Sequence, residues 1–272
     1  MEDPSTCSLE KFWQHLQAAP QKVLLLDYDG TLAPFQLERD RAFPYHGVRK
    51  MLEKILASGK TRLIIVSGRA LEDLLPLLGL KHLPELWGSH GFERRLPDGT
   101  LLNQELPPNC WLNLEKAYNW MQEQGFAGDC EKKPSSIAFH WRGVEKKKRQ
   151  QLAETVRTAW APLTKGVDLE ICTFDGGLEL RCIGYHKGEA VRQVLAECGQ
   201  DVAMAYLGDD LTDEDAFKAL QGKGLSVLVR ETYRETLADC WLQPPQDLLL
   251  FLESWLAFST EKNDVKTKTE IK

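Results

Sequence analysis

The sequence has few of the features that mark a specialised class of protein. Its seven cysteines are scattered, odd in number and without a CxxC pair, so we expect reduced thiols rather than a disulfide framework or a zinc site. The formal net charge of −6 argues against a nucleic-acid partner held by a basic surface. No apolar run approaches the roughly 20 residues of a membrane span, and the acidic N-terminus lacks the apolar stretch of a signal peptide. These absences predict a cytoplasmic protein without a membrane or nucleic-acid partner.

The composition is that of an ordinary globular protein, with 43% hydrophobic and 27% charged residues in a chain of 272. Short apolar runs, which predict strands buried on both faces, lie at 22–29, 61–69, 202–210 and 224–230. Segments of helical period alternate with them, at 8–20, 45–60, 70–80, 187–199, 211–222 and 244–258. This alternation predicts an α/β fold with a doubly wound, Rossmann-like parallel sheet.

A different pattern occupies residues 107–184. The segment 135–142 alternates apolar and polar residues, and two more strands are expected at 167–174 and 177–183. Such alternation predicts an antiparallel sheet with one open face, so this block is expected to be an inserted α+β cap domain. The expected organisation is a core in two parts at 1–106 and 185–260, the cap at 107–184, and a polar, disordered tail at 261–272.

Polar residues follow three of the buried strands at their carboxyl ends. They are Asp27 and Asp29 at the end of 22–29, Ser67, Gly68 and Arg69 at the end of 61–69, and Asp209 and Asp210 at the end of 202–210, with Asp213 just beyond. Lys187 opens the helix that precedes the third of these strands. Because ligands of a parallel α/β sheet bind at the carboxyl ends of its strands, we expect these side chains to share one crevice.

The crevice has the composition of a phosphoryl-transfer site. Several carboxylates raise one another's pKa unless a cation is bound, and carboxylate oxygens with phosphate suit Mg²⁺. Asp27 is then a candidate nucleophile that forms an aspartyl-phosphate. Asp29 can protonate the leaving alcohol and later deprotonate the attacking water. Ser67, Lys187 and backbone N–H groups around Gly30 can bind phosphate oxygens.

The motifs at these positions resemble those of the haloacid dehalogenase superfamily of phosphotransferases. They are DYDGT at 27–31, SGR at 67–69, KG at 187–188 and GDDLTDEDAF at 208–217. A finer resemblance is to the trehalose-6-phosphate phosphatases within that superfamily. It rests on LDYDGTLAP at 26–34, HGFE at 90–93, KPSSIAFHWR at 133–142, LELR at 178–181 and YLGDDLTDEDAF at 206–217, in unbroken order.

The resemblance implies a role for each matching residue. Asp27 would be the nucleophile and Asp29 the general acid and base, with Ser67 and Lys187 completing the catalytic set. Mg²⁺ would be bound by Asp27, Asp209 and the backbone carbonyl of Asp29, with Asp210 and Asp213 close by or reaching the ion through water. The implied phosphate-binding residues are Gly30, Thr31, Ser67, Gly68, Arg69 and Lys187. The implied sugar-binding residues are His90, Gly91, Glu131, Lys133, Arg142 and Glu179, and the cap would close over them as a lid.

The leading hypothesis is therefore a Mg²⁺-dependent phosphatase that converts trehalose 6-phosphate to trehalose through an aspartyl-phosphate. One alternative keeps the chemistry and changes the sugar, to a glucosyl- or mannosyl-glycerate phosphate or to sucrose phosphate. Another alternative is a non-catalytic regulatory partner of a trehalose-phosphate synthase. We expect a monomer whose main partner is a small sugar phosphate, with a separate synthase as a possible protein partner.

Overall fold

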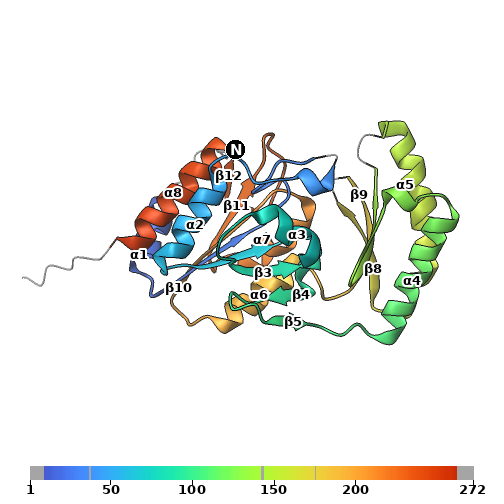
Figure 1. Ribbon diagram of the computed structural model, residues 1–272, viewed down its shortest axis with the longest axis horizontal. Coiled ribbons are helices and arrows are strands. Elements are labelled where there is room, and N and C mark those ends of the chain that lie inside the picture. The colour runs from blue at the N-terminus through green and yellow to red at the C-terminus, as the bar shows by residue number, and fades with distance from the viewer. Residues whose placement is uncertain (1–8, 37, 142–143, 175, 262–272) are drawn as a thin grey trace, which may run out of the picture.

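The computed structural model describes residues 9–36, 38–141, 144–174 and 176–261. It has a large layered body and a smaller one beside it (Figure 1). Within the described residues, the sheet of the larger body runs in the order β12 (Cys240–Leu242), β11 (Leu225–Val229), β10 (Val202–Gly208), β1 (Gln21–Leu26), β2 (Arg62–Val66), β3 (Glu85–Gly88), β4 (Glu93–Arg95) and β5 (Leu101–Asn103). Neighbours from β12 to β3 are parallel, and β4 and β5 join as antiparallel strands. The predicted α/β fold with a doubly wound parallel sheet is confirmed.

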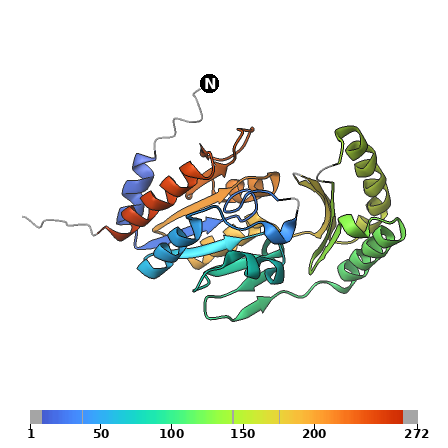
Figure 2. The same ribbon diagram turned by 45° about the horizontal axis from the view of Figure 1, so that its top comes forward.

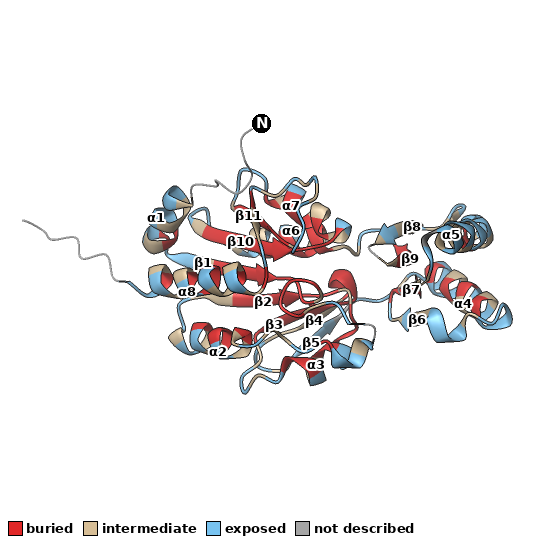
Figure 3. Cartoon of the chain, turned by 90° about the horizontal axis from the view of Figure 1, so that it is seen from above, coloured by how far each residue is buried: buried red, intermediate tan, exposed pale blue. Residues whose placement is uncertain are grey.

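Helices cover both faces of this sheet, as Figure 3 shows by the buried strands between them. The helices are α1 (Glu10–Ala18), α2 (Val48–Ser58), α3 (Leu71–Leu78), α6 (Lys187–Glu197), α7 (Glu214–Leu220) and α8 (Gln246–Thr260). Leu24 and Leu26 of β1 pack with α1, α2, α3 and α8, whereas Val23 and Leu25 pack with α6 and α7. Each leucine buried in this way stabilises the fold by about 1.5–3 kcal/mol.

The order of the strands creates a switch point at β1, because β2 and β10 lie on opposite sides of it. The chain therefore leaves β1 toward one half of the sheet and returns later to build the other half. A crevice opens at the carboxyl end of the strands at such a point. Asp27 lies there as the first residue after β1.

The smaller body is a four-stranded antiparallel sheet with helices on its outer face (Figures 1 and 2). Its elements are α4 (Pro108–Glu123), β6 (Cys130–Lys133), β7 (Ser136–His140), α5 (Lys146–Trp160), β8 (Leu169–Phe174) and β9 (Gly177–Cys182). Leu178 and Leu180 of β9 are buried against α4 and α5. Glu179, between them in sequence, lines a cleft toward the larger body. The alternation along β9 thus gives the sheet one packed face and one face for polar chemistry.

β3 and β4 are adjacent in sequence but are not one continuous strand. β3 ends at Gly88, and a short 3-10 segment η2 (Ser89–Gly91) separates it from β4. Ser89 and His90 both have positive φ, at 47° and 58°. Non-glycine residues in this region cost about 1–3 kcal/mol each and are found mainly at functional sites. The interruption turns His90 away from the sheet and toward the smaller body.

Cys110, Cys130, Cys172, Cys182 and Cys198 are free thiols, as expected. Cys240 is disulfide-bonded, so the expectation of reduced thiols is wrong there. Spacing along the chain does not reveal which cysteines meet in space. No helix in the described part of the chain has the length and apolar character needed to span a membrane. The tail expected at 261–272 lies outside the described residues beyond Glu261.

Candidate active site

Asp27 is held at the end of β1 by backbone pairing with β10. Its N–H donates to Leu207 O at 2.8 Å, and the residue is 3% exposed. The chain then turns at Gly30, where φ is +84°. A Cβ atom at Gly30 would lie 2.2 Å from Asp209 Oδ2. Only glycine therefore lets the Gly-Thr turn approach Asp209 this closely.

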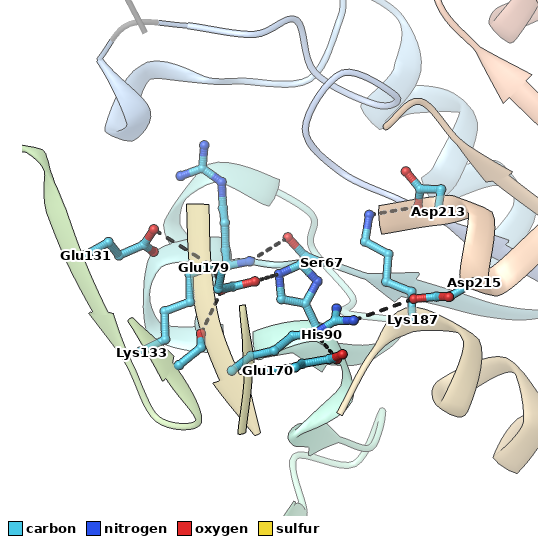
Figure 4. A network of polar contacts seen from close by, with 12 residues as sticks. Ser67, His90, Glu131, Lys133, Glu170, Glu179, Lys187, Asp213 and Asp215 are labelled. Carbon is cyan, nitrogen blue, oxygen red and sulfur yellow. Dashed lines mark hydrogen bonds and ion pairs between the residues drawn. The ribbon is translucent and has the colours of Figure 1, made fainter. Parts of the chain in front are cut away.

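Lys187 is a buried cation at the start of α6 (Figure 4). Its Nζ donates to Asp27 Oδ1 at 2.6 Å and to Asp213 Oδ1 at 2.7 Å. Burial alone would lower the pKa of Lys187, but the charges of Asp213 and Asp27 raise it. Tyr206 OH also donates to Asp213 Oδ1, at 2.6 Å. Lys187 is therefore a permanent positive charge against the candidate nucleophile.

Three buried carboxylates fit a divalent cation. Ligand oxygens of Asp27, Asp209 and Asp213 lie within 4.8 Å of one another. Both carboxylate oxygens of Asp209 are buried and have no hydrogen-bond partner among the described residues; Arg230 Nη1 lies 3.9 Å from Oδ2. Burial and the charges of Asp27 and Asp213 raise the pKa of Asp209 well above its usual value. Since the same causes would be offset by a bound cation, these carboxylates surround a candidate metal site. Asp213 is not assigned as a ligand, because both of its oxygens already accept hydrogen bonds from Lys187, Tyr206 and two backbone N–H groups.

Burial likewise raises the pKa of Asp27 to about 7, against the lowering effect of Lys187. A nucleophilic carboxylate has to be ionised. A cation among these carboxylates would favour the ionised form at neutral pH.

Asp29 points to another cation, Arg69, from the loop after β2. The two form a bidentate pair, with Arg69 Nε to Asp29 Oδ2 and Nη2 to Oδ1, each at 2.6 Å. Arg69 is 6% exposed, and its N–H donates to Ser67 Oγ at 3.1 Å. Ser67 thus fixes the loop that presents the guanidinium. The candidate acid and the candidate phosphate-binding arginine are paired with each other in this state.

His90 reaches from η2 to the smaller body. Its Nε2 lies 3.1 Å from Glu179 Oε2, whereas its buried Nδ1 has no hydrogen-bond partner among the described residues. A Cβ atom at Gly68 would lie 2.6 Å from His90 Cε1, so Gly68 is needed for the ring to fit. Burial lowers the pKa of His90, although Glu179 acts to raise it. A neutral His90 that donates through Nε2 leaves Nδ1 as an acceptor for a ligand hydroxyl.

The roof of the cleft is a set of charged residues on β6, β7 and β9 (Figure 4). Glu179 Oε1 accepts from Lys133 Nζ at 2.8 Å and from Ser136 Oγ at 2.7 Å. Glu131 Oε2 lies 2.9 Å from His140 Nε2. Burial would raise the pKa of Glu131, but the charge of Lys133 and the contact with His140 lower it to about 2. Both glutamates are therefore charged acceptors, suited to bind sugar hydroxyls.

Comparison with known proteins agrees with the resemblance drawn from the sequence motifs. A family model described as trehalose-phosphatase matches residues 25–240. The chain belongs to the trehalose-phosphatase family. "Probable trehalose-phosphate phosphatase H" of Arabidopsis thaliana is 32% identical over 273 residues, which cover 93% of this chain and 76% of that protein. "Trehalose-phosphate phosphatase B" of the same plant is 31% identical, and the aligned region covers 90% of this chain and 70% of that protein. The resemblance drawn from the motifs, and the prediction of an enzyme of this family, are confirmed.

Solved structures support the fold. The C-terminal domain of the trehalose-6-phosphate phosphatase of C. albicans superposes with a TM-score of 0.80 at 21% identity, covering 93% of this chain and 98% of that chain. A haloacid dehalogenase-like hydrolase from B. subtilis superposes with a TM-score of 0.60 at 16% identity, covering 86% and 99%. The fold is thus that of the haloacid dehalogenase superfamily.

Most of the predicted site residues line one cleft between the two bodies of the enzyme. They are Asp27, Asp29, Gly68, Arg69, His90, Glu131, Lys133, Glu179, Lys187, Asp209 and Asp210. The predicted residues Gly30, Thr31, Ser67, Gly91 and Asp213 are outside this lining. The predicted Arg142 is outside the described residues. Residues that line the cleft without having been predicted are Phe35, Arg39, His140, Phe174 and Thr212.

Some of the predicted residues outside the lining hold the lining residues in position. Thr31 Oγ1 donates to Asp27 Oδ2 at 3.2 Å, so it orients the candidate nucleophile. Asp213 accepts the backbone N–H groups of Asp209 and Asp210 at 3.0 and 2.9 Å, which fixes the turn after β10. Gly91 faces α6 instead, where a Cβ atom would lie 3.5 Å from Ala190 Cβ, an ordinary contact. Its φ of +109°, rather than lack of space, is what favours glycine there.

The lowered pKa of His90 predicts a pH dependence of stability. Because the unfolded chain binds a proton at this histidine more readily, its stabilising effect is complete above its usual pKa of about 6.5 and is lost at lower pH. The expected result is that wild type loses more stability than His90→Gln between about pH 7.5 and pH 5.5. Urea unfolding of both proteins at the two values measures this difference. Equal losses in the two proteins would contradict a buried, neutral His90.

Proposed function

We propose that this enzyme hydrolyses trehalose 6-phosphate to trehalose and inorganic phosphate, with Mg²⁺ as cofactor and an aspartyl-phosphate on Asp27. The observation that carries the proposal is the cleft itself. Its floor offers a buried carboxylate beside a buried lysine, and its roof offers Glu131 and Glu179 as charged acceptors. Relatives at 31–34% identity that carry the name trehalose-phosphate phosphatase support the choice of substrate.

In the first step, a carboxylate oxygen of Asp27 forms a bond to phosphorus while the bond from phosphorus to the sugar oxygen breaks. Lys187 stays close to both the attacking carboxylate and the phosphoryl oxygens, where its charge offsets theirs. Asp29 gives its proton to the departing sugar oxygen. In the second step Asp29 takes a proton from water as the water oxygen attacks phosphorus and restores Asp27.

The residues that would hold Mg²⁺ are Asp27, Asp209 and the backbone carbonyl of Asp29. When bound, the ion supplies positive charge against the phosphoryl oxygens and the carboxylates. This proposal accounts for the two Asp209 oxygens, which accept no hydrogen bond from any residue that the structure describes.

Asp29 has to leave Arg69 to handle a proton. A guanidinium fork matches two phosphoryl oxygens as well as it matches a carboxylate. We therefore propose that the phosphate of the substrate recruits Arg69 and that Asp29 is released by this exchange. Binding of the correct group would thus free the Asp29 carboxylate, which would take from water the proton that it gives to the sugar oxygen.

Residues 107–184 are proposed to act as a cap that opens for the sugar and closes over it. Lys133, Glu179 and His90 meet at the roof and would bind hydroxyls. Closure would exclude bulk water from the phosphoryl transfer. A cytoplasmic location, a monomeric state and a separate synthase partner stay predictions.

A similar solved structure bears on the alternative of a non-catalytic regulator. The C-terminal domain of the C. albicans trehalose synthase regulatory protein superposes with a TM-score of 0.70 at 13% identity, which shows the fold alone. Asp27, Asp29, Lys187 and Asp209 are all present here and line one cleft. A regulator would not need this set, so the catalytic hypothesis is favoured.

A substrate panel tests the proposal. Trehalose 6-phosphate, sucrose phosphate, glucosyl-glycerate phosphate and glucose 6-phosphate are compared for phosphate release with Mg²⁺ and after its removal by chelation. We expect kcat/KM to be highest for trehalose 6-phosphate by at least about tenfold, because each hydroxyl-binding group left unpaired by a wrong sugar costs about 1–3 kcal/mol. Release should stop without the metal. Equal rates across the panel would contradict the assigned sugar, and metal-independent release would contradict the cofactor.

A further inference from the structure

Two of the contacts between the two bodies lie at the cleft and join its floor to its roof; a third, between Arg181 of β9 and Asp215 of α7 at 3.7 Å, lies outside the residues that line the cleft. His90 of the larger body pairs with Glu179 of β9. Arg39, in the short 3-10 segment η1 (Arg39–Arg41) of the larger body, donates through Nη2 to Glu131 Oε1 on β6. Each contact joins a side chain of the larger body to a carboxylate of the smaller one, through a neutral histidine at Glu179 and through a cation at Glu131 (Figure 4 shows the pair of His90 and Glu179). The cleft is therefore closed by one hydrogen bond and one ion pair between its two walls.

The closed cleft is small. Its volume is about 90 Å³, whereas pockets for ligands of the size of a disaccharide phosphate hold about 300–1,000 Å³. A sugar phosphate therefore cannot enter while both walls are held together. The contacts that span the cleft have to break before the sugar can take their place.

Glu131 is the carboxylate for which a sugar and Arg39 would compete. Arg39 occupies Oε1 and His140 lies 2.9 Å from Oε2, so both oxygens are engaged. The Glu131 side chain is 9% exposed, but that of Arg39 is 33% exposed. The arginine thus has a path into solvent, whereas the glutamate stays in the roof.

We propose that Arg39 is a positioning residue that holds the cap shut over the empty cleft and yields Glu131 to the sugar on binding. The inference rests on the proposed function for the identity of the sugar. Its physical content is a population shift: the apparent affinity falls by the fraction of molecules that are open. Arg39 sets that fraction without touching the reacting atoms.

Arg41 is a matched control on the same 3-10 segment. It lies two residues from Arg39 but pairs with Glu38, and the two side chains are 70% and 61% exposed. Replacing either arginine by alanine removes one positive charge and one long side chain. Only the Arg39→Ala change removes a contact between the walls of the cleft.

The first measurement is kinetic. For trehalose 6-phosphate, Arg39→Ala should lower KM about fivefold and leave kcat within about twofold of wild type. This is the effect expected when a partly exposed ion pair that competes with substrate is lost. Arg39→Lys, which keeps the charge, should return KM toward the wild-type value. Arg41→Ala should match wild type. A KM that rises in Arg39→Ala would make Arg39 a ligand of the sugar and overturn the inference, as would an unchanged KM.

The second measurement needs no turnover. Small-angle X-ray scattering of the ligand-free proteins should give a larger radius of gyration for Arg39→Ala than for wild type and Arg41→Ala. Identical scattering curves for the three proteins would overturn the inference. If wild type failed to hydrolyse trehalose 6-phosphate, the proposed function would fall while the scattering comparison would still decide the role of Arg39.

Discussion

Asp27→Asn is expected to lower kcat for phosphate release by a factor on the order of 10⁴ or more, as removal of a catalytic nucleophile does elsewhere. An amide of the same shape keeps the packing but cannot form the acyl phosphate. Stability in the absence of metal should be equal or higher. Burial and the charge of Asp213 raise the pKa of Asp27, which shows that the buried carboxylate is itself unfavourable there. Phosphate release checks the expected loss of kcat, and urea unfolding of the same preparation checks the expected stability.

The matched control is Asp98→Asn, the same chemical change at an exposed turn. Asp98 Oδ1 accepts the backbone N–H of Thr100 at 2.9 Å, and Asp98 is not among the residues that line the cleft. This variant should keep wild-type kinetics. If Asp27→Asn retained more than about a hundredth of wild-type kcat, another group would have to be the nucleophile, because loss of a nucleophile leaves far less than this.

The sequence was sufficient to bring Asp27, Asp209 and the loop at 67–69 together. Each follows a buried apolar strand, and the carboxyl ends of parallel strands meet at one edge of a sheet. The pairing of β1 with β10 and with β2 realises this. No knowledge of side-chain contacts is needed for that step, because it depends only on strand direction and strand order.

Arg39 could not be predicted in the same way. It lies between β1 and α2 in a stretch without helical or strand period, so no face can be assigned to it from the pattern. Its partner Glu131 is 92 residues away in another layer of the fold. A contact of this kind depends on how the two bodies are placed relative to each other, which local sequence does not encode.

The turn at η2 shows a further limit. Gly88 and Gly91 flank Ser89 and His90, and a sequence pattern would assign positive φ to the glycines. Gly91 has it, at 109°, but Gly88 does not, at −100°, and both residues between them do. The positive φ of Ser89 and His90 persists because the ring of His90 is held by Gly68 and by Glu179. Tertiary contacts therefore outweigh the local preference. The pairing of Asp29 with Arg69 is likewise a tertiary contact, and no rule of sequence spacing predicts it.

Lys187→Met is expected to lower both stability and activity. Lys187 is 3% exposed and is the cation shared by Asp27 and Asp213. Removing one partner from a buried ion pair costs about 3–5 kcal/mol, because the remaining charges lose their compensation. The loss should be larger at about pH 8 than at about pH 5, since carboxylates with raised pKa values bind protons in the folded state and recover stability as the pH falls. Urea unfolding at both pH values measures the difference.

The double variant Lys187→Met/Asp213→Asn separates the stability effect from the catalytic one. Neutralising Asp213 removes one of the two uncompensated charges, so at least about 1 kcal/mol of stability should return relative to Lys187→Met. Activity should not return, because the lysine charge that offsets Asp27 and the phosphoryl oxygens during attack is still missing. A double variant that regained turnover would show that Lys187 serves only to balance Asp213. One that regained no stability would show that the contact between Lys187 and Asp213 is not what holds the floor of the cleft together.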